Sequence, residues 1–243
     1  MIASKVGLPV GEDANARGLS RKHIRHSIED SLRRLGVDYL DLYQIHRFDA
    51  ATPMDETIAA LDDVVRAGKA LYVGASSMHA WQFARLLARC NATGAARFAT
   101  MQSHYNLVYR EEEREMIPLC VAEGVGVLPW SPLARGLLAG NRAAGGTPRA
   151  KSDDIARRFY AHESDDAVLA RVADIARRRG VSAAQVALAW LMAQPGVVAP
   201  LIGASKLHHI DDGCAAVALK LEPEEMKILA DAYRPHPIIG HHA

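Results

Sequence analysis

Short apolar segments alternate with amphipathic segments along nearly the whole chain, and this alternation constrains the fold more than any other feature. Each apolar segment is too short for a helix, and turn-forming residues bound it. Repeated strand–helix units predict a parallel sheet covered by helices, either doubly wound or closed into a barrel. The predicted strands are Ile2–Val6, Tyr39–Ile45, Leu71–Ala75, Phe98–Ser103, Val125–Trp130 and Val197–Ile202.

The segments between these strands have helical spacing and helix-ending signals. Ser20 is a suitable N-cap for a helix that Gly36 ends, and Thr52-Pro53 starts a second helix that reaches Gly68. We expect a long loop from Ser131 to Ser164 with a short helical piece at its end. The further predicted helices are Trp81–Cys90, Glu111–Glu123, Ile155–Tyr160, Asp165–Arg179, Ala183–Ala193, His208–Val217 and Pro223–Ala232.

Polar or otherwise distinctive residues follow the predicted strands. They are Lys5, His46, Ser76, Ser77, Gln102, Trp130, Ser131 and Gly203 to Lys206. A TIM barrel places its functional groups at these strand ends, whereas a doubly wound sheet gathers them at one crevice. No GxGxxG follows any strand. The sequence therefore favours an α/β fold of the TIM-barrel type in one domain over residues 1–243, although six strands are recognised rather than eight.

Composition excludes several classes of protein. The 29 basic and 28 acidic residues give a net charge of +1, which predicts binding neither to nucleic acid nor to an anionic membrane. No apolar run has the length of a transmembrane helix. Three widely spaced cysteines predict reduced thiols and a cytoplasmic protein. The histidines lack metal-ligand spacing and are expected on the surface or in loops, so no metal is predicted.

Five motifs in order resemble the aldo-keto reductase family, most of all its bacterial and potassium-channel β-subunit branch. They are VDYLDLYQIH (37–46), VGASSM (73–78), MQSHYNL (101–107), PWSPLARGLL (129–138) and IGASK (202–206). Five motifs in the right order are far more specific than any one alone. The resemblance implies a (β/α)8 barrel and a small-molecule carbonyl substrate, an aldehyde or ketone that NADPH reduces to an alcohol.

The resemblance also implies catalytic residues. Lys5 matches the lysine of the family's third strand, and His46 matches the histidine that ends the fourth. The family's catalytic aspartate and tyrosine belong to its first two βα units, which no residue here matches. We therefore expect an N-terminally truncated barrel with slow hydride transfer, because a positioned acid contributes ~10²–10⁴-fold. The alternative is a non-catalytic NADP(H)-binding or regulatory protein on the same scaffold.

Cofactor contacts follow from the same resemblance. Side chains at three strand ends would hold the nicotinamide, small residues would lie along the pyrophosphate, and one further segment would surround the adenosine 2′-phosphate. His209 stands where the family often has Gln or Arg, so NADH is kept as an alternative to NADPH. The implied cofactor residues are Ser76, Ser77, Gln102, Trp130, Ser131, Leu133, Gly136, Leu137, Gly203, Ala204, Ser205, Lys206 and His209.

A barrel that lacks two strands would have open edges at Ile2–Val6 and Val197–Ile202. Exposed parallel edges tend to recruit another chain. This predicts a homo-oligomer that pairs through these edges.

Overall fold

The computed structural model describes residues 1–140, 159–160 and 165–241. Within it the chain forms two compact units, which we describe separately. Unit 1 comprises Met1–Gln102, Glu115–Gly126 and the C-terminal residues from Gly240 onward. Unit 2 comprises Ser103–Arg114 and Val127–Ile239.

Unit 1 is built on parallel strands. β1 (Ala3–Val6), β2 (Leu40–Ile45), β3 (Ala70–Ser76) and β4 (Phe98–Gln102) pair in chain order, and each pairing is parallel. The two-residue β5 (Gly126–Val127) completes the sheet order β1-β2-β3-β4-β5. The predicted α/β class with a parallel sheet is confirmed, and it is consistent with part of a TIM-type barrel.

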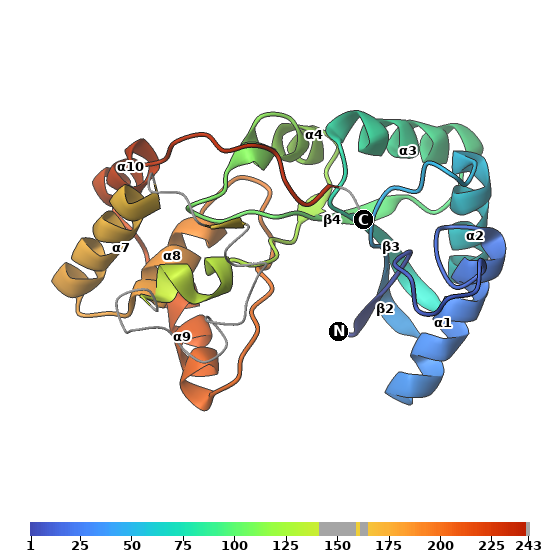
Figure 1. Ribbon diagram of the computed structural model, residues 1–243, viewed down its shortest axis with the longest axis horizontal. Helices are drawn as coiled ribbons and strands as arrows, with labels where there is room; N and C mark the ends of the chain where they lie inside the picture. Colours follow the sequence, from blue (N-terminus) through green and yellow to red (C-terminus); the bar gives the residue numbers. More distant parts are fainter. Residues whose placement is uncertain (141–158, 161–164, 242–243) are drawn as a thin grey trace. The chain divides into compact units, whose positions relative to one another are not determined.

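Three helices line one side of the strands of unit 1 (Figure 1). They are α1 (Arg21–Leu35), α2 (Met54–Arg66) and α3 (Ala80–Thr93), and the shorter α4 (Met116–Ala122) follows β4 along the chain. The Ser20 hydroxyl caps α1, and Gly36 ends it in the left-handed conformation, as predicted. Buried apolar side chains fill the space between helices and strands; on α1 these are Ile24, Ile28 and Leu32.

Side-chain contacts identify which face of the sheet the helices cover. The Tyr43 hydroxyl of β2 donates to the Ile24 carbonyl of α1 at 3.2 Å. The Phe98 ring of β4 packs edge-on against Phe83 of α3, with ring centroids 5.9 Å apart. Tyr43 and Phe98 therefore face the helices. Since side chains alternate along a strand, the neighbours of Tyr43 in β2 point to the other face.

Unit 2 consists mainly of helices. α7 (Asp165–Arg179) packs against α8 (Ala183–Met192) and α10 (Pro223–Asp231), and α9 (Leu207–Ala218) packs against α8. Trp190 of α8 is buried in this unit. Two short 3₁₀ segments, η1 (Glu111–Glu113) and η2 (Ala134–Ala139), precede these helices in the chain. Residues 141–158 and 161–164 of the predicted long loop, including most of its short helix, lie outside the described residues.

Three predicted elements differ from those observed, and each contains a proline. The strand predicted over Val125–Trp130 is reduced to β5, after which Trp130 forms only isolated parallel bridges, and Pro129 lies in the interruption. The helix predicted over Glu111–Glu123 is split into η1 and α4, because Pro118 lacks an N–H and is tolerated only in the first turn of a helix. The strand predicted over Val197–Ile202 is reduced to two isolated parallel bridges, Val197 with Val127 and Leu201 with Trp130. Pro200 cannot donate to a ladder, which interrupts this strand.

All three cysteines are in the reduced thiol form, with Cys90 and Cys120 buried and Cys214 exposed. None of the helices in the described residues is long and apolar enough to cross a membrane.

Replacing Gly74 with alanine is expected to destabilise the protein by about 1–3 kcal/mol, the usual cost of overpacking a well-packed site. The added Cβ would lie 2.4 Å from Thr100 Oγ1 and 3.1 Å from Gln44 Cγ. Urea unfolding measures the change. Gly203→Ala is the matched control because nothing lies within 4 Å of its added Cβ. Equal stability of the two variants would contradict this packing analysis.

Candidate functional site

The register of the sheet places several predicted site residues on one face of unit 1. Lys5 pairs with Gln44, Gln44 with Gly74, and Gly74 with Thr100. The register between β3 and β4 shifts between Val73 and Gly74, so Thr100 pairs on this face although Phe98, two residues earlier, faces the helices. Paired residues in neighbouring parallel strands point to the same side of a sheet. Ser76 pairs with Gln102 two residues further along, again on that side. This is the face opposite the helices, and its carboxyl-terminal end is where TIM-type enzymes place their chemistry.

The two predicted catalytic residues lie at the ends of neighbouring strands. Lys5 is the third of the four residues of β1, and His46 directly follows β2. The His46 N–H still donates to the Val6 carbonyl at 2.8 Å, so the ladder between the two strands continues to this residue. Both side chains are half-buried. The structure thus brings the predicted lysine and histidine together within unit 1.

Burial and positive charge dominate the electrostatics at this strand end. Burial, the Arg47 guanidinium and the Lys5 ammonium together lower the pKa of His46 to about 4. His46 is therefore neutral at pH 7, with one ring N–H as a donor. Burial, and secondly Arg47, lower the pKa of Lys5. Among the residues that the structure describes, neither Lys5 nor Arg47 forms an ion pair with a carboxylate.

The remaining predicted residues of unit 1 surround the carboxyl end of β4. The Ser76 hydroxyl donates to the Gln102 carbonyl at 2.8 Å, and the Ser77 N–H donates to the same oxygen at 3.1 Å. Ser77 has φ 23°, outside the usual range for a side chain of L configuration. Such backbone conformations persist where surrounding contacts impose them, often at functional sites. Ser76, Ser77 and Gln102 are all buried.

In unit 2, Trp130 lies at one end of a stack of aromatic rings. Its ring is parallel to that of His104, with centroids 4.2 Å apart, and His104 stacks in the same way on Tyr109 at 4.1 Å. Trp130 is half-buried. Its apolar aromatic face is of the kind on which the planar ring of a ligand can stack.

Hydrogen bonds from neighbouring side chains fix this stack and the next residue. His104 Nε2 and the Tyr160 hydroxyl lie 2.5 Å apart, and the same hydroxyl donates to Ser131 Oγ at 3.1 Å. Asn106 Nδ2 donates to the Ser131 carbonyl at 2.9 Å. The predicted Trp130 and Ser131 are therefore held by three buried side chains: His104, Asn106 and Tyr160.

The loop after Ser131 has an unusual backbone. Ser131, Ala134 and Arg135 have φ of 55°, 47° and 55°, and Gly136 has φ 98°. Positive φ at non-glycine residues is uncommon, and each such residue costs of order 1–3 kcal/mol. Turns that mix right- and left-handed conformations direct successive N–H groups into concavities that bind anions. The predicted pyrophosphate residues Ser131, Leu133, Gly136 and Leu137 lie within this turn.

The predicted phosphate segment lies in front of α9. Gly203, Ala204, Ser205 and Lys206 are exposed, and Lys206 is the N-cap residue of the helix. The Ser205 N–H donates to Nδ1 of His209 at 3.3 Å, so these two residues are in contact. A helix N-terminus with a lysine beside it attracts anions.

Four residues that contact the predicted ones in units 1 and 2 were not predicted from the sequence. Gln44 lies two positions before His46, so strand alternation alone could have placed it on the same face. His104 was expected on the surface or in a loop but is fully buried, because it lies between the rings of Trp130 and Tyr109. Asn106 lay within a quoted motif without an assigned role, and no signal in the sequence marked Tyr160 as part of this cluster.

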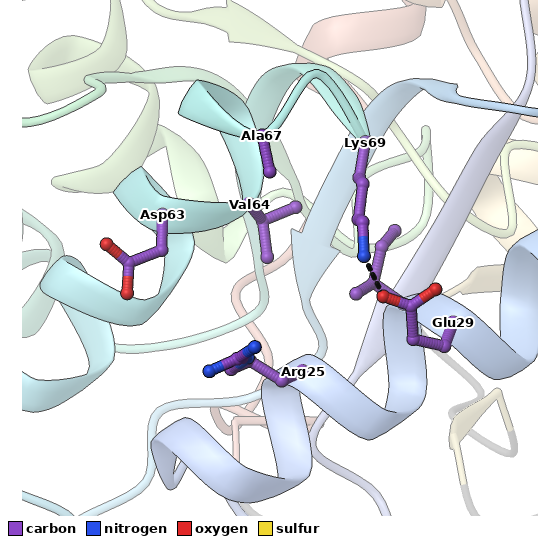
Figure 2. Close-up of a pocket in the computed structure, with 7 residues that line it drawn as sticks. Arg25, Glu29, Asp63, Val64, Ala67 and Lys69 are labelled. Atoms are coloured by element: carbon purple, nitrogen blue, oxygen red, sulfur yellow. Dashed lines mark hydrogen bonds and ion pairs between the residues drawn. The ribbon is translucent and has the colours of Figure 1, made fainter.

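A groove elsewhere in unit 1 does not include any predicted site residue (Figure 2). It has a volume of about 210 Å³ and lies between α1 and α2, with Arg25, Glu29, Asp63 and Lys69 among its lining residues. Lys69 immediately precedes β3, so the groove is near the amino end of that strand and away from Lys5 and His46. In the described residues no three His, Cys, Asp or Glu side chains are grouped to hold a metal ion.

His46 should lower the stability of the protein as the pH falls from 6.5 to about 4. Its pKa is about 4 in the folded chain and 6.5 when exposed, so the unfolded chain takes up the proton first. Above pH 6.5 both states are neutral and His46 has no effect. NMR titration of the ring should give this pKa, and His46→Gln should show a weaker pH dependence of unfolding.

Arg47→Gln should raise the pKa of His46 part of the way toward 6.5, because it removes one positive charge and leaves burial in place. Arg34→Gln, which changes an exposed arginine of α1, is the control and should leave the titration unchanged. An unchanged His46 pKa in the Arg47 variant would contradict the electrostatic analysis.

Tyr160→Phe should destabilise the protein by about 1–3 kcal/mol, the usual cost of removing one partner of buried hydrogen bonds. The lost hydroxyl serves both His104 and Ser131. Thermal or urea unfolding measures the loss. Tyr72→Phe, at a ring that is 61% exposed, is the control, and a loss of similar size there would refute the assignment.

The sequence is similar to proteins of known families. The model of the aldo/keto reductase family matches residues 1–234. A versiconal hemiacetal acetate reductase of Aspergillus parasiticus is 45% identical over 94% of this chain and 67% of its own length. Aldo-keto reductases of Fusarium vanettenii and Alternaria alternata are 45% and 44% identical, each over 93% of this chain.

The chain spans about two thirds of the length of these curated relatives, between 61% and 67%. The family model covers almost all of the sequence. The chain belongs to the aldo/keto reductase family.

Proposed function

We propose that this protein is an NADPH-dependent reductase that converts aldehydes or ketones to alcohols, with Lys5 and His46 at the reacting oxygen. Family membership supports the oxidoreductase class. The observation that supports the site most strongly is the proximity of Lys5 and a neutral His46 at the ends of two paired strands. A carbonyl oxygen that becomes negative requires a cation and a hydrogen-bond donor beside it.

In the proposed reaction each residue has a separate task. Bound NADPH would supply a hydride to the carbonyl carbon. His46 would donate its ring N–H to the carbonyl oxygen and so fix the orientation of the substrate. The Lys5 ammonium would stabilise the negative charge on that oxygen. Its lowered pKa makes it a stronger acid than an exposed lysine, so Lys5 can supply the proton that the alkoxide needs. Because no residue here matches the family's catalytic tyrosine, we expect this proton transfer to be slow.

Each unit, taken by itself, has groups that suit one part of such a cofactor. A nicotinamide has a carboxamide, and buried amide and hydroxyl groups of Gln102 and Ser76 lie at adjacent strand ends of unit 1. In unit 2, Trp130 offers an aromatic face, and the turn from Ser131 has the backbone geometry of an anion site. Lys206, with Ser205 beside it, supports a phosphate and therefore NADPH over NADH.

Lys5→Met tests this proposal. The variant should lose carbonyl reduction by at least ~10²-fold, since charge stabilisation and proton transfer are both removed, while its affinity for NADPH stays within a few-fold. Turnover is followed by NADPH absorbance with a panel of aliphatic and aromatic aldehydes, and affinity by calorimetry with NADPH and NADH. Lys22→Met, at an exposed lysine of α1, is the control and should keep full activity.

Each outcome has a distinct meaning. Binding of NADPH without turnover of any aldehyde would replace the reductase proposal by the second one, a non-catalytic NADP(H)-binding or regulatory protein. Absence of heat with either coenzyme would reject both. The branch of the family, the cytoplasmic location and a homo-oligomer that pairs through sheet edges stay predictions.

A further inference from the structure

A buried amide pair crosses the sheet and includes Gln102, one of the residues proposed to hold the nicotinamide. Gln102 Nε2 donates to Gln44 Oε1 at 3.2 Å. The two residues belong to β4 and β2, which are not neighbours, because β3 lies between them. Only 1% of Gln44 and 5% of Gln102 is exposed. Neither residue titrates, so the contact persists at every pH at which the protein is folded.

The crossing is possible because β3 has a glycine at this level. A Cβ on Gly74 would lie 3.1 Å from Gln44 Cγ and 2.4 Å from Thr100 Oγ1. The side chains from both neighbouring strands therefore occupy the space that a side chain on β3 would need. Gly74 is required here for close approach and not for a special backbone conformation.

Packing alone does not account for Gln44. Its Nε2 is buried and has no hydrogen-bond partner among the described residues. An unpaired buried amide nitrogen costs about 1–3 kcal/mol, and an apolar side chain of similar length would avoid that cost. The feature that Gln44 provides and an apolar residue would not is the acceptor for the Gln102 amide.

This acceptor determines how the Gln102 amide is turned. The amide nitrogen and oxygen of Gln102 are bonded to the same planar carbon. Because the nitrogen points toward Gln44, the oxygen must point in the other direction available to the amide. The Gln102 backbone is also held, since its carbonyl accepts from the Ser76 hydroxyl and the Ser77 N–H. Gln102 is thus fixed in both position and orientation.

We propose that Gln44 is a positioning residue for the cofactor, because it orients the Gln102 amide so that its oxygen accepts a hydrogen bond from the NH₂ of the nicotinamide carboxamide. The proposal rests on the proposed function, in which Gln102 contacts that carboxamide. Gln44 itself acts through Gln102 and need not touch the cofactor.

A merely structural role for Gln44 makes a different prediction. If the pair only stabilises the sheet, its loss should affect every ligand of the protein alike. If it orients Gln102, its loss should affect only ligands that have a nicotinamide. A cofactor fragment that contains adenosine with its 2′-phosphate, the pyrophosphate and the second ribose, but no nicotinamide, separates the two roles.

The experiment compares NADPH with 2′-phospho-ADP-ribose by calorimetry on the full chain. Gln44→Met keeps the length of the side chain and removes the amide. We expect its Kd for NADPH to rise about three- to tenfold, the effect of one lost net hydrogen bond, and its Kd for the fragment to stay the same. Gln44→Glu, which keeps an acceptor oxygen, should bind NADPH more tightly than Gln44→Met.

A double-mutant cycle with Gln102 provides the control for coupling. Gln102→Met should weaken NADPH binding, and adding Gln44→Met to it should cause no further change. Independent, additive effects of the two substitutions would overturn the proposal. Equal weakening of NADPH and the fragment by Gln44→Met would do the same, because it would indicate general disruption.

A measurement without cofactor separates this proposal from the proposed function. In ¹⁵N NMR spectra of the free protein, the chemical shifts of the Gln102 side-chain NH₂ group should change in Gln44→Met. They should not change in Gln194→Met, the same substitution elsewhere in the chain. Unchanged shifts in Gln44→Met would refute the amide pair. If the shifts change but the unaltered protein binds neither NADPH nor the fragment, the proposed function fails, and the cofactor role of Gln44 with it.

Discussion

The parallel register of β1 to β4 is the constraint on which the candidate site depends. It places Lys5, Gln44, Gly74 and Thr100 in one row across the sheet. A slip of one residue in any pairing would turn the polar residues of that strand toward the helices. The apolar side chains that face α1 to α3 prevent such a slip, because it would expose them. The apolar core of unit 1 therefore stabilises the unit and also determines which residues lie on the polar face of the sheet.

Much of the fold could be predicted from sequence, because apolar runs and caps are local signals. Ser20 and Gly36 bound α1 as expected. Local signals failed where a proline removed one N–H inside a longer pattern. Pro118 split a predicted helix, and Pro200 reduced a predicted strand to two bridges. In both cases the apolar pattern was correct and the backbone hydrogen bonds decided the outcome.

The site was predicted less completely than the fold. Lys5, His46 and Gln102 were predicted from their motifs, and each lies within one residue of a strand's carboxyl end. Gln44 and His104 were not, because their roles arise from contacts across other strands or between rings. Gln44 reaches Gln102 only over the glycine of β3, and His104 is buried only because Trp130 and Tyr109 enclose it. Such contacts depend on register and packing, which no single motif encodes.

The two faces of the sheet in unit 1 differ in a way that supports the proposed location of the site. On the helix side, buried side chains are apolar or, like Tyr43, hydrogen-bonded. On the other side, Gln44 Nε2 and Thr100 Oγ1 are buried without hydrogen bonds among the described residues, and two half-buried cations lie together at the strand ends. Each of these features lowers stability. Apolar residues would pack better at these positions. The presence of polar and charged residues there therefore supports the proposal that this face binds a ligand.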